Sequence, residues 1–163
     1  IIKMDIYRSN VALIIFNKKG DLLLCKRKKM DSWQFPQGGI DVKESELQAA
    51  YRELYEEVGI SKNKVELIKK HDEWLKYDIP SISRRTSHSN KKFKGQKQKY
   101  FLFKLVKETK IYFDNDPDSE FDDYKWVSYW YPLKIIIDFK KEVYREALNK
   151  LKFSYCRSIN NVD

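Results

Sequence analysis

One segment constrains the fold more than any other: an acidic stretch enclosed between a helix start signal and a helix stop signal. Residues 45–48 have the Ser-x-x-Gln form of a capping box, in which two side chains satisfy free backbone amides at a helix N-terminus. Gly59 stands where a glycine commonly ends a helix. The segment between these signals predicts a helix of about three to four turns. Its expected buried stripe consists of Leu47, Ala50, Leu54 and Val58.

The same helix would carry Glu53, Glu56 and Glu57 on one side. Positions i, i+3 and i+4 fall within an arc of about 100°, with neighbouring Cβ atoms about 5–6 Å apart. Like charges at this spacing destabilise a helix by about 0.2–0.5 kcal/mol per pair, so the cluster favours a bound cation. Oxygen ligands without histidine or thiolate suit Mg²⁺ or Mn²⁺, which also bind substrate phosphate. Taken alone, however, a glutamate-rich helix is more often a solvated face.

The remainder of the chain predicts one α/β domain over residues 1–163, because no linker or internal repeat interrupts it. Strands are expected at 11–17 and 22–27, joined by a turn that contains Gly20, and at 65–67, 74–79, 100–106 and 124–130. Loops are expected at 37–39 and over the lysine-rich stretch 81–98. Helices are expected at 132–138 and 140–152, the second with Val143, Ala147 and Leu151 on its buried side.

The charge of the chain indicates which class of partner it binds, and its cysteine content indicates the cellular compartment. The chain has 33 Lys and Arg against 24 Asp and Glu, a net charge of +9 that favours phosphate-rich partners or simply reflects a solvated basic surface. Its two cysteines, Cys25 and Cys156, are expected to be free thiols in a reducing compartment. No apolar run is long enough for a membrane span or a signal peptide. A cytoplasmic protein without membrane association is therefore expected.

The spacing around the acidic helix decides between a solvated face and a site. Five residues separate Gly38 from Glu44, and seven separate Glu44 from Arg52. At about one in fifteen for each of the seven strict positions, this order arises by chance about once in 10⁸ starting points. The pattern is that of the Nudix box, formed here by Gly38, Glu44, Arg52, Glu53, Glu56, Glu57 and Gly59. The chain thus resembles the Nudix hydrolase family.

That resemblance implies an α/β/α sandwich with a mixed β-sheet between helices, and hydrolysis of a nucleoside diphosphate linked to another group. Further segments resemble one branch of the family, the bacterial RNA pyrophosphohydrolases: residues 7–11, 32–40, 95–99, 120–122, 126–132 and 139–140. Residues 33–39 and 128–132 are also similar to those of dinucleoside tetraphosphate hydrolases, so they indicate the subgroup more firmly than the substrate. Ser9 departs from the proline usual in the branch, and the loop 81–94 diverges.

The resemblance also implies roles for the acidic residues. Mg²⁺, or alternatively Mn²⁺, would be held by Gly38, Glu53, Glu56, Glu57 and Glu120. Either Glu53 or Glu120 would accept the proton of the attacking water, and the sequence leaves open which one does. Arg52 is expected to pair with Glu44, which would reach in from the loop before the helix, or to orient Glu53.

For the substrate, the resemblance implies contacts to the 5′ polyphosphate and to a base. The phosphate candidates are Arg8, Arg27, Gln96, Lys97 and Lys99, and Phe139 would stack a base whose other face Arg27 covers. The expected reaction removes pyrophosphate from 5′-triphosphorylated RNA, leaves a 5′ monophosphate and promotes mRNA decay. Two alternatives stay open: hydrolysis of diadenosine tetraphosphate, and an RNA-binding protein with an inactive Nudix fold. A monomer is expected, and no protein partner is indicated.

Overall fold

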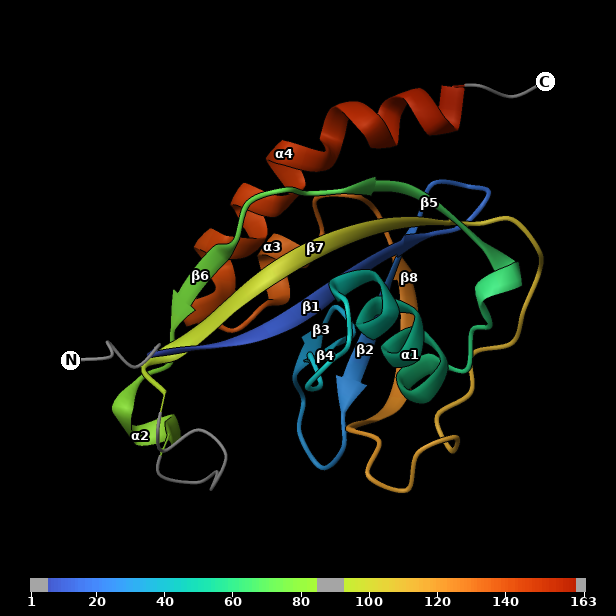
Figure 1. Cartoon of the computed structure of the whole chain (residues 1–163). Coiled ribbons are helices and arrows are strands. Elements are labelled where there is room, and N and C mark those ends of the chain that lie inside the picture. Colours follow the sequence, from blue (N-terminus) through green and yellow to red (C-terminus); the bar gives the residue numbers. More distant parts are fainter. Residues whose placement is uncertain (1–5, 85–92, 161–163) are drawn as a thin grey trace.

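The computed structural model of the chain describes residues 6–84 and 93–160. Within these ranges a mixed eight-stranded sheet lies between α1 (Glu46–Val58) on one side and α3 (Pro132–Ile135) and α4 (Lys141–Asn160) on the other (Figure 1). The α/β/α sandwich with a mixed sheet is therefore confirmed. Short helical segments complete the chain at η1 (Lys62–Lys64), α2 (Ser81–Arg84) and η3 (Asp138–Lys140).

The strands follow the chain as β1 (Tyr7–Phe16), β2 (Leu22–Arg27), β3 (Trp33–Gln34), β4 (Gln37–Gly39), β5 (Val65–Lys70), β6 (Leu75–Asp78), β7 (Gly95–Leu105) and β8 (Phe121–Val127). β1 and β7 run parallel and lie side by side (Figure 1), and both β5 and β6 pair antiparallel with β7. On the other side of the sheet, β2 pairs antiparallel with β3 and β8. The sheet thus has two parts, one centred on β7 and one on β2.

These two parts separate between β1 and β2. In the described chain the ladder between them contains one register pair, Phe16 opposite Leu22, next to the connecting turn. Beyond that point β4 pairs with β1 instead, and the Leu13 N–H donates to the Pro36 carbonyl at 2.9 Å. The segment 36–39 therefore enters the sheet where the strands diverge, and this opening is where the candidate site lies.

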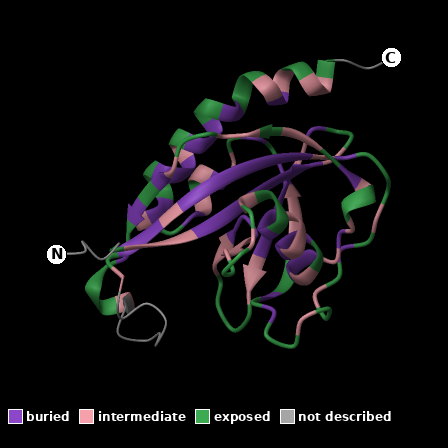
Figure 2. Cartoon of the chain, viewed as in Figure 1, coloured by how far each residue is buried: buried purple, intermediate pink, exposed green. Residues whose placement is uncertain are grey.

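Alternation along the central strands produces a core on each side of the sheet. Ala12, Ile14 and Phe16 pack toward α4, whereas Val11, Leu13 and Ile15 pack toward α1. Because both faces are covered, β1 and β7 are buried along most of their length (Figure 2), and residues 11–16 of β1 and 100–103 of β7 form continuous apolar runs rather than alternating ones.

The structure corrects several expected boundaries. The stretch 81–98 is not a continuous loop, because α2 begins it and β7 starts at Gly95; residues 85–92, with Arg85 and His88, lie outside the described ranges. Residues 37–39 form β4, and β8 begins at Phe121 rather than at 124. For β4, β7 and β8, pairing with a distant strand supplies the backbone hydrogen bonds that local composition does not indicate.

The helices also differ from their expected form. Leu47 is 37% exposed, and Ala49 is buried in its place, because α1 presents positions 49, 50, 53, 54, 57 and 58 to the sheet. α4 continues to Asn160, two turns beyond the expected end, with Tyr155 donating from its hydroxyl to the Gly20 carbonyl at 2.5 Å. That contact fixes the last turns of α4 to the turn between β1 and β2.

Two further expectations concern membranes and cysteines. Among the residues that the structure describes, no helix has the length and apolarity that crossing a membrane requires. Cys25 is buried, Cys156 is half-buried, and both are free thiols as expected.

Candidate active site

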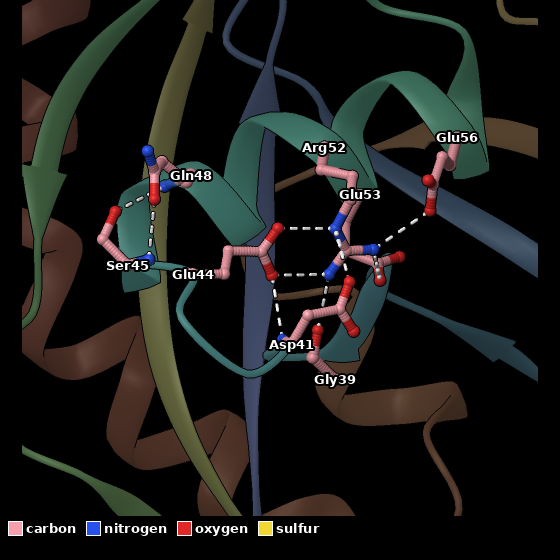
Figure 3. Close-up of polar contacts among 8 residues, drawn as sticks. All are labelled: Gly39, Asp41, Glu44, Ser45, Gln48, Arg52, Glu53 and Glu56. Atoms are coloured by element: carbon pink, nitrogen blue, oxygen red, sulfur yellow. Dashed lines mark hydrogen bonds and ion pairs between the residues drawn. The ribbon is translucent and has the colours of Figure 1, made fainter.

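Helix α1 is defined at both ends by the residues that the sequence indicates. The Gln48 N–H donates to the Ser45 hydroxyl at 3.1 Å, and the Ser45 N–H donates to the Gln48 side-chain oxygen at 2.8 Å (Figure 3). Gly59 ends the helix at φ 71°, a left-handed conformation that glycine adopts at little cost. Local contacts therefore fix both ends of the helix that carries Glu53, Glu56 and Glu57.

Arg52 joins the loop before α1 to the carboxylates on the helix. Its Nε and Nη2 donate to the two carboxylate oxygens of Glu44 at 2.7 and 2.9 Å, and Nη2 also donates to the Gly39 carbonyl at 2.8 Å (Figure 3). Nη1 donates to Glu53 at 2.8 Å and to Glu56 at 3.0 Å. The hydrogen bonds from Arg52 hold the pKa of Glu44 below its usual value. Both expected partners of Arg52, Glu44 and Glu53, are thus present together.

Glu53 and Glu57 lie deeper than the other carboxylates, each 7% exposed. Burial raises the pKa of Glu53 to about 7 although Arg52 opposes the shift. Burial, and then the negative charges of Glu53 and Glu120, raise the pKa of Glu57 to about 7. The negatively charged forms of these two carboxyl groups are therefore disfavoured at neutral pH unless a cation compensates the charge.

Gly38 and Glu120 lie next to these carboxylates and complete the lining of a cavity. A Cβ atom on Gly38 would overlap the Glu53 carboxylate, so glycine lets that carboxylate lie against β4 and a larger residue would displace it. Glu120 precedes β8 and donates from its backbone N–H to Glu57 at 3.4 Å. Glu53, Glu57 and Glu120 line one cavity of about 160 Å³ with Gly38. Residues far apart in the sequence are thus brought together as expected.

The oxygen ligands of this cavity are of the kind that binds a divalent cation, but their side chains are not arranged around one. Carboxylate and carbonyl oxygens are the ligands that Mg²⁺ and Mn²⁺ prefer. In the described part of the chain, no three acidic, histidine or cysteine side chains are placed to hold an ion as they stand. Arg52 holds Glu53 and Glu56 toward itself. Binding would therefore require local rotation of these side chains, for which the cavity has room.

A larger cavity of about 450 Å³ adjoins the first. Arg8, Gln96 and Glu120 line both cavities, so the two lie side by side. Arg27 and Phe139 line the larger one, and the Phe139 ring stacks on Tyr77 with centroids 6.1 Å apart. The expected phosphate and base contacts Arg8, Arg27, Gln96 and Phe139 therefore line these two neighbouring cavities.

Lys97 and Lys99 lie on the opposite face of β7 from this space. Gln96 points toward the cavities, and successive residues of a strand point to opposite faces. The Lys97 and Lys99 ammonium groups lie 5.1 and 4.9 Å from the centroid of the Trp74 indole, and Lys99 also donates to the Asp72 carbonyl. The structure thus does not bring these two lysines together with the other candidates.

Several lining residues were not among the site residues expected from the sequence. Three of them are exposed apolar side chains at the larger cavity: Met30, Ile82 and Ile137. Another is Lys140, which is 7% exposed and donates to the Gln34 side-chain oxygen at 3.3 Å. Burial and, to a smaller extent, the charge of Arg27 lower the pKa of Lys140 to about 8. A lysine beside an expected helix start is ordinarily solvated, so only the tertiary structure reveals its position.

Comparisons with known proteins agree with the resemblance found in the sequence. The model of the NUDIX domain family matches residues 6–147. A protein of Francisella tularensis subsp. mediasiatica named RNA pyrophosphohydrolase is 48% identical over 147 residues, which cover 90% of this chain and 94% of that protein. A protein of the same name from Francisella philomiragia is 46% identical over the same shares of the two chains.

Among solved structures, the E. coli dihydroneopterin triphosphate pyrophosphohydrolase superposes with a TM-score of 0.69 and 21% identity, covering 90% of this chain and 99% of the other. A C. elegans Ap4A hydrolase superposes with a TM-score of 0.61 and 23% identity, covering 88% and 98%. At this level of identity the solved structures share the fold with the chain.

Proposed function

The chain belongs to the Nudix hydrolase family, and we propose that it is a metal-dependent RNA pyrophosphohydrolase, which removes pyrophosphate from the 5′ end of triphosphorylated RNA and so promotes mRNA decay. The observation that carries the proposal is the adjacency of two cavities, one lined by carboxylates and one by arginine and aromatic side chains. A 5′-triphosphorylated transcript offers both chemistries, a polyphosphate followed by bases. An RNA substrate also accords with a cytoplasmic location.

The acidic cavity is suited to hydrolysis of a phosphoanhydride. Nudix hydrolases generally use divalent cations, and such a cation would neutralise charge that develops on the phosphate and lower the pKa of water. Glu53, Glu56, Glu57 and Glu120 would hold Mg²⁺ together with the Gly38 carbonyl. Either Glu53 or Glu120 would accept the water proton, and the fact that both line the cavity supports this. Arg52 keeps Glu53 oriented through Nη1.

The larger cavity supplies contacts for the nucleic acid. Arg8 lies beside the carboxylates and would contact the phosphates, with Gln96 next to it. Arg27 and Phe139 would enclose a base, because aromatic and guanidinium planes stack on any base. Lys97 and Lys99 line neither cavity and are left out of the proposed contacts.

The decisive experiment compares turnover of 5′-triphosphorylated RNA of several nucleotides with turnover of diadenosine tetraphosphate in one Mg²⁺ buffer. We expect faster turnover of the RNA, with pyrophosphate and 5′-monophosphate RNA as products. Faster turnover of the dinucleotide would instead favour a dinucleoside polyphosphate hydrolase. Absence of turnover of both would favour an inactive Nudix fold that binds RNA.

Phe139→Ala tests the base contact in the same assay. Loss of stacking of about 1–3 kcal/mol per base corresponds to a decrease of about 5- to 150-fold in kcat/KM for the RNA, and to a much smaller one for a nucleoside triphosphate. Because Phe139 also packs on Tyr77, Phe139→Leu is the matched control for packing. An equal loss on every substrate, accompanied by a lower melting temperature, would show that Phe139 is a core residue.

A further inference from the structure

Between the two cavities lies a group of buried amide side chains whose hydrogen bonds all run in one direction. Gln96 is 8% exposed, and its side-chain oxygen accepts from Asn10 Nδ2 at 2.5 Å, from the Tyr77 hydroxyl at 2.5 Å and from Gln37 Nε2 at 3.3 Å. Asn10, on β1, is 2% exposed and stands opposite Gly39 of β4 in the ladder. The Asn10 side chain is thus held by Gln96, and its backbone is held by the sheet.

Lys140 fixes this direction, because an ammonium group donates hydrogen bonds and accepts none. Its Nζ lies 3.5 Å from the Gln37 oxygen, which therefore faces Lys140. The Gln37 nitrogen consequently donates to the oxygen of Gln96, and Asn10 must also approach that oxygen with its nitrogen. The order of donors and acceptors leaves the Asn10 oxygen, Oδ1, pointing away from Gln96.

Asn10 Oδ1 is buried and has no hydrogen-bond partner among the described residues. Buried acceptors in native proteins are rarely left unpaired, so this atom calls for a donor from outside the chain. The Asn10 side chain lines the cavity that contains Glu53, Glu57 and Glu120. Ionised carboxylates and phosphate oxygens only accept hydrogen bonds and cannot satisfy it. Water can, and Mg²⁺ and Mn²⁺ keep several waters when bound to carboxylates.

We propose that Asn10 Oδ1 accepts a hydrogen bond from a water molecule of the hydrated divalent cation at Glu53, Glu57 and Glu120. Asn10 is then a positioning residue of the cation site, oriented by Gln96 and ultimately by Lys140. Partners of this kind, which contact a metal through its ligands, contribute strongly to metal affinity. The inference rests on the metal dependence of the proposed function and is independent of which nucleotide the enzyme hydrolyses.

The test measures Mn²⁺ binding to the full chain by titration calorimetry and electron paramagnetic resonance, without substrate. Asn10→Ala, which removes the acceptor, should raise the dissociation constant of Mn²⁺ about 10- to 100-fold. Asn10→Asp, which keeps oxygen acceptors at the same place, should bind Mn²⁺ at least as tightly as the wild type. Asn149→Ala, on the exposed side of α4, is the matched control and should leave the dissociation constant unchanged.

Glu57→Gln tests whether the measured Mn²⁺ binds in the carboxylate cavity, because the variant should weaken binding if it does. Wild-type affinity in Asn10→Ala, together with weaker binding in Glu57→Gln, would overturn the role of Asn10 alone. Equal weakening by Asn10→Ala and Asn10→Asp would also overturn it, because the bond to Gln96 would then be what matters. Absence of Mn²⁺ binding to the wild type would overturn the metal dependence as well. If Asn10→Ala does not fold, Asn10→Ser provides the same comparison with a shortened polar side chain.

Discussion

Replacement of Arg52 by alanine would remove the group that holds the loop before α1 to the helix. The Arg52 side chain is 25% exposed, and its guanidinium forms charge-assisted hydrogen bonds to Glu44, Glu53 and Glu56 and one to the Gly39 carbonyl. Such bonds contribute about 1.5–3 kcal/mol each, but they are not additive when one side chain makes them all. Loss of the half-buried cluster should therefore lower the free energy of unfolding by about 3 kcal/mol, near the lower end for a broken buried ion pair.

For a domain of this size, about 3 kcal/mol corresponds to a decrease of about 6–12 °C in melting temperature, measured by circular dichroism in EDTA. Arg52→Lys should show an intermediate loss, because lysine keeps the charge but not the two-pronged contact with Glu44. The control is Arg145→Ala, which breaks an exposed pair with Glu142 and should change the melting temperature by little. A melting temperature of Arg52→Ala within about 2 °C of the wild type would refute the reasoning.

The loss should also depend on pH. Arg52 lowers the pKa of Glu53, which burial raises to about 7, so removal of Arg52 should raise that pKa further. A carboxyl group whose pKa is higher in the folded than in the unfolded chain favours folding less as pH rises through the folded value. The difference in melting temperature between Arg52→Ala and the wild type should therefore be larger at pH 8 than at pH 6.

Other predictions address the metal, the cysteines and the buried lysine. EDTA should abolish activity and Mg²⁺ restore it, and Glu57→Gln should lower the rate at least about a hundredfold, about 2.7 kcal/mol in the barrier, with the fold retained; a near wild-type rate would contradict this role. Cys25 and Cys156 should both react with a thiol reagent in denatured, unreduced protein, whereas a crosslink between them would contradict the free thiols. Lys140→Met should raise the melting temperature at pH 7, because burial lowers the pKa of Lys140 to about 8. The gain should shrink as pH rises through 8 toward the unfolded value near 10.5, and an equal gain at pH 7 and pH 10 would show that the buried charge costs nothing.

The acidic helix could be predicted from sequence because its signals are local. Ser45 and Gln48 start α1 and Gly59 ends it, each through contacts within a few residues. Given those ends, the side of the helix that carries Glu53 and Glu57 follows from the helical period alone. The contact of Arg52 with Glu44 was instead expected from the resemblance to the Nudix family.

The substrate side of the site was less predictable because it depends on strand pairing. β7 opens with Gly95, Gln96, Lys97 and Gln98, which are polar, and the sequence therefore indicated a loop. Pairing with β1 makes these residues a strand, and the register then sends Gln96 and Lys97 to opposite faces. A family resemblance assigns both to the substrate, whereas the alternation of the strand separates them.

The charge distribution indicates that the basic surface alone does not bring a polyphosphate to the acidic cavity. The chain is basic overall, with a net charge of +9, yet five carboxylates gather around α1. Arg52 pairs with those of Glu44, Glu53 and Glu56, and Arg8 lines the same cavity as Glu53, Glu57 and Glu120, so carboxylates outnumber guanidinium groups there. A polyphosphate drawn in by the basic surface would be repelled at the point where it must be hydrolysed. A divalent cation bound by these carboxylates would offset part of that negative charge, and the buried Asn10 oxygen would help orient the cation without adding charge. We therefore expect metal binding to aid the placement of the phosphates as well as their hydrolysis.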